Sequence, residues 1–119
     1  MANRHRGEIA AHFGDGPHVL CLTLGALAEL ENAFGASGIA DLARRFEGGN
    51  LSALDLVKII GAGLRGAGGA LSDEEVARLS HPEGLPGFVR IAAALIVATF
   101  GDATPLPDTP ANPPAPQDA

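Results

Sequence analysis

The sequence has one cysteine, no excess of basic residues and no long uninterrupted apolar run. Cys21 alone cannot form an intramolecular disulfide, and the first residues lack the apolar core of an export signal, so we expect a cytoplasmic protein. Eight Lys and Arg stand against 14 Asp and Glu, and this net charge of −6 excludes the basic footprint of a nucleic-acid binder. The longest apolar stretch, residues 88–100, is interrupted by Arg90 and is shorter than the about 20 residues that a membrane span needs.

Catalytic and cofactor-binding motifs are also scarce. Residues 61–66 read GAGLRG, which matches the G-x-G-x-x-G pattern of dinucleotide-binding loops. Such a loop must follow a strand and open a helix, whereas here a capped helical pattern precedes it and more glycines follow. The glycines are better explained by close helix packing or by a flexible exit from the preceding helix. A nucleotide-binding protein therefore remains only an alternative.

Candidate metal ligands and acid–base pairs are equally weak. His12 and His18 flank a predicted turn, with Cys21 nearby, but Cys21 is three positions from His18 and would face the other side of a strand. Glu29 and Glu31 are two apart, so they do not share a helix face and are expected to be solvated. We predict no catalytic, cofactor-binding or metal-binding residues and no enzyme, with a metal-binding protein as a further alternative.

Alternation and turn residues predict one β-hairpin at the N-terminus. Its arms are Glu8 to Phe13 and His18 to Leu22, and Gly14 to Pro17 form the turn. Thr23 can cap a helix that ends at Gly35. The apolar residues of this helix recur at spacings of three, three and four, which predicts one inward face made of Leu24, Leu27, Leu30 and Phe34.

Four further helices are predicted. The second covers Gly38 to Glu47, the third follows a capping box of Ser52 and Asp55, the fourth follows a capping box of Ser72 and Glu75, and the fifth covers Phe88 to Phe100. The third helix, with Leu56, Ile59, Ile60 and Leu64 (or Gly63) inward, is expected to lose its regular structure in the glycines from residue 61 onward. The fold class is therefore mainly α, with about five helices and one hairpin in a domain spanning residues 1–101.

Residues 102–119 contain six prolines and little to bury, which predicts a Pro-rich, acidic tail that is extended or disordered. The fifth helix is apolar nearly all round, so it is either a core helix or a helix whose second face meets a partner. Candidate partner-binding residues lie on the first and fifth helices. They are Leu24, Leu27, Phe88, Ile91 and Leu95.

The segments carrying LTLGALAELE and GLRGAG, with SDEEVARL after them, resemble the small tail protein of gene transfer agents and related siphophages. The resemblance covers about residues 6–101. Members of that family are labelled phage tail tube proteins and are also placed among the tail assembly chaperones, and no catalytic residues come with it. It implies a non-enzymatic, phage-derived protein of a virus-like particle, cytoplasmic during assembly, with the tape measure protein and tail tube protein as partners and a homo-oligomer as a further option.

The two labels make different physical demands on the chain. A tube subunit contributes strands to a continuous barrel, which requires many paired strands. The sequence offers one hairpin and is otherwise helical, which favours a chaperone of the tape measure protein and tube subunits over a structural tube component. A third possibility is that the hairpin binds a partner directly, because an exposed strand edge can add to a partner's sheet.

Overall fold

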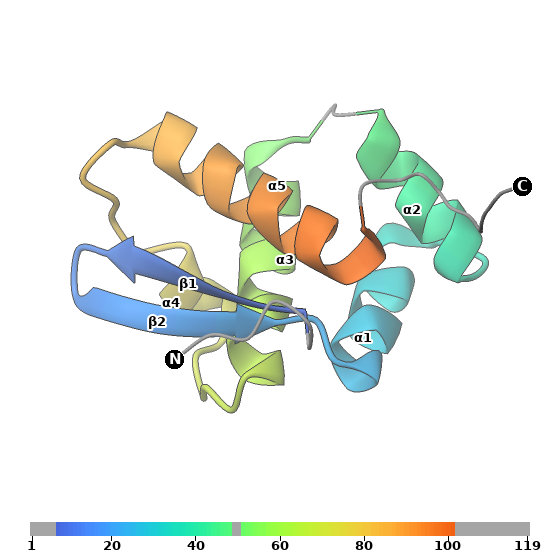
Figure 1. Ribbon diagram of the computed structural model, residues 1–119, viewed down its shortest axis with the longest axis horizontal. Coiled ribbons are helices and arrows are strands. Elements are labelled where there is room, and N and C mark those ends of the chain that lie inside the picture. The colour runs from blue at the N-terminus through green and yellow to red at the C-terminus, as the bar shows by residue number, and fades with distance from the viewer. Residues whose placement is uncertain (1–6, 49–50, 102–119) are drawn as a thin grey trace, which may run out of the picture.

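A two-stranded antiparallel hairpin packs against helices in the computed structural model, which describes residues 7–48 and 51–101 (Figure 1). Strand β1 (Glu8–Phe13) pairs with β2 (Gly16–Cys21), and Ile9 lies opposite Leu20. The predicted hairpin is confirmed, but its turn is shorter than expected. The second strand begins at Gly16, whose φ of 124° is open to glycine and rare for other residues.

Helix α1 (Leu24–Phe34) begins and ends where the sequence predicts. The Thr23 hydroxyl accepts a hydrogen bond from the backbone N–H of Ala26, and Gly35 ends the helix with a φ of 66°. The prediction that Leu24 faces inward is wrong, because its side chain is 81 % exposed whereas Leu30 is buried. Each step of three residues falls about 60° short of a full turn, so two such steps place Leu24 about 120° from Leu30.

Four more helices follow in the described residues. They are α2 (Ile39–Glu47), α3 (Ala53–Gly66), α4 (Asp73–Val76) and α5 (Leu85–Phe100). Both predicted capping boxes are present, Ser52 with Asp55 and Ser72 with Glu75, whereas α4 is only one turn long. Helix α5 begins earlier than expected, because Pro86 fits the first turn of a helix, where its missing N–H has no partner to lose. The predicted tail, residues 102–119, lies outside the described residues.

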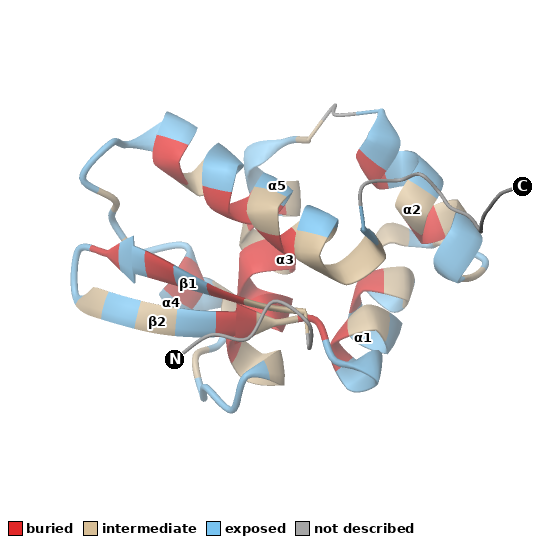
Figure 2. Cartoon of the chain, in the orientation of Figure 1, coloured by how far each residue is buried: buried red, intermediate tan, exposed pale blue. Residues whose placement is uncertain are grey.

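Helix α3 is the centre of the core. It packs against β2, α1 and α5. Buried residues run along α3 and alternate with exposed ones in β1 (Figure 2). The expectation that α3 becomes irregular in its glycines is wrong, since the helix continues through Gly66 and buries Gly61 and Gly63. The architecture is a mainly helical domain with one hairpin, as predicted.

Candidate interaction surface

The GAGLRG motif lies inside α3 and does not form a loop. A Cβ added at Gly63 would lie 2.6 Å from Leu95 Cδ2, and one added at Gly66 would lie 2.0 Å from the backbone oxygen of Cys21. The glycines therefore let the helix backbone approach β2 and α5. A phosphate-binding loop needs free backbone amides at a helix start, and this motif occupies the C-terminal half of a helix instead.

The histidines of the hairpin do not face each other. In the strand register His12 lies opposite Pro17 and His18 lies opposite Ala11, which places the two histidines on opposite faces of the hairpin. His18 Nε2 is 3.0 Å from a carboxylate oxygen of Asp15 in the turn. Across residues 7–48 and 51–101, no three His, Cys, Asp or Glu side chains are grouped so that they could hold a metal ion.

A charged cluster joins α1, α3 and α4. Asp73 accepts hydrogen bonds from Lys58 Nζ and Arg65 Nη2, each at 2.9 Å, and Arg65 also pairs with Glu29. Burial by itself raises the pKa of Asp73, but the hydrogen bonds from Lys58 and Arg65 outweigh it and hold the pKa below its usual value. The sequence predicts that Glu29 is solvated, but in the structure it forms an ion pair with Arg65. Each charge is compensated within the cluster, which links both α4 and α1 to α3.

We expect the Asp73→Asn variant to be less stable than the wild type at neutral pH, with the difference shrinking below about pH 4. The folded-state pKa of Asp73 is depressed, so its stabilising contribution is present above the unfolded pKa and is lost as the pH falls through the folded one. Urea unfolding at pH 7 and pH 3 measures this, with Glu74→Gln, an exposed neighbour, as the control. An equal stability difference at both pH values would contradict the prediction.

Helix α5 has two different faces. Ile91, Ala92 and Leu95 are buried in the core, and Leu95 is 0 % exposed. On the other side lie Leu85, Val89, Ala93 and Val97, which we call the α5 surface; Leu85, Val89 and Val97 are 62 %, 45 % and 40 % exposed. The core-helix interpretation therefore holds for one face of α5, and the other face is an exposed apolar row.

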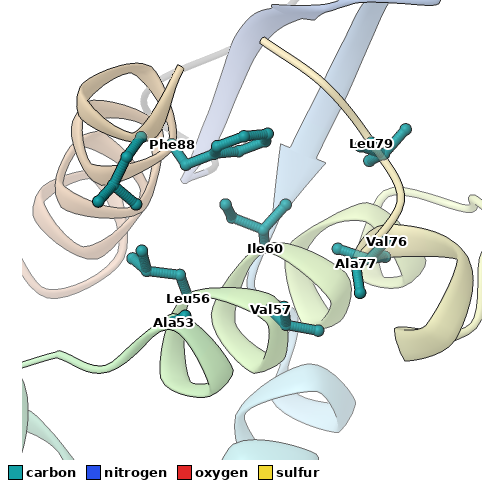
Figure 3. A pocket seen from close by; sticks show the side chains of 9 residues that line it. Ala53, Leu56, Val57, Ile60, Val76, Ala77, Leu79 and Phe88 are labelled. Atoms are coloured by element: carbon teal, nitrogen blue, oxygen red, sulfur yellow. The ribbon is translucent and has the colours of Figure 1, made fainter.

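An apolar hollow lies at the N-terminal end of the α5 surface. Phe88 of α5 points toward the space above Leu56 and Ile60 of α3, and Val76 and Leu79 close the opposite side (Figure 3). Its volume is about 140 Å³, and its lining side chains are all apolar. It can hold an apolar side chain but offers no group for chemistry.

A second apolar groove lies at the other end of α5, which we call the α2–α5 groove. Its volume is about 420 Å³, and it is lined by residues of α2 and α5 together with Gly101: Ala43, Phe46, Glu47, Ile96, Val97 and Phe100. Val97 belongs both to this groove and to the α5 surface. The α5 surface is thus an apolar row with a hollow at each end, and we take it as the candidate binding surface.

The five sequence-predicted partner-binding residues do not form one patch. Leu24 is exposed at the start of α1 and Leu27 is half-buried, while Phe88 lines the hollow of Figure 3. Ile91 and Leu95 lie in the core, so their side chains are not at the surface of the folded chain. Sequence reasoning missed Val89 and Val97, because a helix that is apolar all round carries no periodic signal for its inward face.

Comparison with known protein families gives a match over most of the chain. The family model described as "Phage tail tube protein, GTA-gp10" matches residues 6–102. Searches of curated proteins and of solved structures find no match. Of the helices in the part of the chain that the structure describes, none combines the length and apolar content that a membrane crossing requires.

Proposed function

Because the chain belongs to the phage tail tube protein GTA-gp10 family, we propose that it acts in tail assembly as a non-enzymatic chaperone of the tape measure protein and tube subunits. The match confirms the resemblance seen in the sequence and makes the chain a phage tail protein. On this proposal the protein works in the cytoplasm while tails are built. Its contacts with other tail proteins run through the α5 surface, with Phe88 at one end.

The exposed row on α5 is the observation that carries the proposal. Its residues are spaced by four, which is the spacing of one of the ridges that fit into the grooves of a neighbouring helix. Contiguous apolar surface on a small protein marks an interaction site. A partner helix with its own apolar stripe, as expected of a long helical tape measure protein, fits this ridge and its terminal hollows.

A structural tube component is the second candidate, and the family's description favours it. A tube wall built as a closed barrel takes paired strands from every subunit. The described residues contain one two-stranded sheet, and its inner face is already covered by α3 and α5. Only its outer face and strand edges remain for neighbours, which supports the chaperone over the tube subunit.

We expect this protein to co-purify with the tape measure protein before tails form, and to be absent or far below tube stoichiometry in finished particles. A chaperone leaves as tube subunits replace it, whereas a tube subunit stays. Quantitative mass spectrometry of purified particles, with tube and capsid proteins as internal standards, measures the ratio. Stoichiometric amounts along the tail would overturn the chaperone and establish the tube component instead.

A further inference from the structure

The α2–α5 groove has an aromatic wall. The rings of Phe46 and Phe100 lie with their centroids 6.1 Å apart, Ile96 and Val97 add aliphatic surface, and Glu47 is the one charged residue of the lining. Gly101, the last described residue, is itself part of the lining. The chain therefore leaves the described domain from within the groove, and whatever follows Gly101 starts beside this surface.

The residues that follow have the composition that such grooves bind. Residues 103–107 read ATPLP, with Leu106 between two prolines. Proline-rich segments favour the polyproline II conformation and dock on aromatic-lined grooves at low entropic cost, because their backbone is already restricted. Leu106 is five residues beyond Gly101, a span of at most about 18 Å of extended chain, so it can reach the groove that begins at Gly101.

The charges of the segment after Gly101 and of α2 support this segment as the occupant of the groove. Residues 102–119 carry Asp102, Asp108 and Asp118 and contain no Lys or Arg. On α2, Arg44 and Arg45 directly follow the groove residue Ala43, and their side chains are largely exposed. Asp41 pairs with both arginines, so their charge is partly compensated, but the side chains of Arg44 and Arg45 are 67 % and 47 % exposed.

We propose that residues 103–107 of this chain bind in its own α2–α5 groove, with Leu106 and its flanking prolines against Phe46 and Phe100. Asp108 then lies near the two arginines of α2. The bound segment covers Val97, which is the C-terminal end of the α5 surface. It therefore competes with a partner helix for that end; this consequence rests on the proposed function, whereas the docking does not.

Methyl and aromatic NMR of the full chain tests the docking. Leu106→Asp is compared with Ala111→Asp, which makes the same charge change in the same proline-rich stretch but outside the docking segment. We expect Leu106→Asp to shift the signals of Ile96, Val97 and Phe46, and Ala111→Asp to leave them unchanged. Equal shifts in both variants, or no shift at these residues, would overturn the docking.

A dilution series distinguishes docking within one chain from docking between two copies of the chain. Docking within one chain leaves the groove signals independent of protein concentration over a tenfold range. If the signals move toward those of Leu106→Asp on dilution, the groove is filled by another copy and the proposal is wrong.

Competition is tested by tape measure binding of the same two variants. We expect Leu106→Asp to bind the tape measure protein at least about threefold more tightly than Ala111→Asp. If both variants bind the tape measure protein equally while the NMR shifts of docking are present, the competition is wrong and the docking stands. Absence of any tape measure binding, with docking intact, counts against the proposed function alone.

Discussion

The Gly66→Ala variant is expected to lose about 3 kcal/mol or more of unfolding free energy, at or above the upper end of the usual range of about 1–3 kcal/mol for overpacking. A Cβ at this position would lie 2.0 Å from the backbone oxygen of Cys21 and 3.2 Å from its carbonyl carbon. The added Cβ is fixed directly to the backbone at the end of α3, and the atoms that it meets are backbone atoms at the end of β2. Neither can swing away as a long side chain could, so α3 and the hairpin must separate.

The atoms that an added Cβ would meet predict a graded loss of stability among three Gly→Ala variants. Gly63→Ala meets mainly the flexible end of Leu95, at 2.6 Å, so a smaller loss of about 1–3 kcal/mol is expected. Gly25→Ala on α1 meets nothing closer than 4.0 Å and should be neutral or up to about 1 kcal/mol more stable, since alanine is the better helix former. Urea unfolding of the three variants gives the order. A Gly66→Ala protein as stable as Gly25→Ala would contradict the packing of α3 against β2.

The same glycines show where sequence reasoning about this chain succeeds. The capping box of Ser52 and Asp55 predicts a helix ahead of the G-x-G-x-x-G pattern, and it opens α3 in the structure. Caps, glycine stops and a short hairpin depend on residues within four positions of each other. Those elements could therefore be predicted from the sequence, nearly to their boundaries.

The end of α3 could not be predicted in the same way. Local propensity disfavours glycine in a helix by about 1 kcal/mol per residue. In the fold, however, Gly61 and Gly63 are buried, and only a residue without a side chain fits between α3 and its neighbours. Packing across distant segments outweighs the local preference, and a single sequence does not state which segments those are.

The candidate surface was predictable only in part. The sequence identified α5 as the helix that meets a partner or fills the core, but its outward row is set by how α5 lies on α3 and β1. Ile91 and Leu95 turn inward and Val89 and Val97 outward, although all four are aliphatic. Tertiary contacts determine which of these residues face the core, because the side-chain type is the same on both faces of α5.

Two substitutions on α5 separate its core face from its outer face. Leu95→Ala removes a side chain that is 0 % exposed and should cost about 2–5 kcal/mol, which corresponds to a fall in Tm of roughly 4–8 °C per kcal/mol. Val89→Asp adds a charge at a position that is 45 % exposed and should change stability by only about 0.5 kcal/mol. Differential scanning calorimetry measures both.

Val89→Asp should change stability little, but it should strongly weaken the binding of a partner. If the α5 surface packs on a partner helix, Val89→Asp places an unpaired charge in that contact, and tape measure binding should weaken at least tenfold, or about 1.4 kcal/mol. Ala28→Asp makes the same charge change at an exposed position of α1 and should bind like the wild type. Isothermal titration with a tape measure fragment gives the three affinities. Wild-type affinity of Val89→Asp would remove the α5 surface from partner binding, whereas unchanged stability of Leu95→Ala would mean that α5 does not contribute to the core.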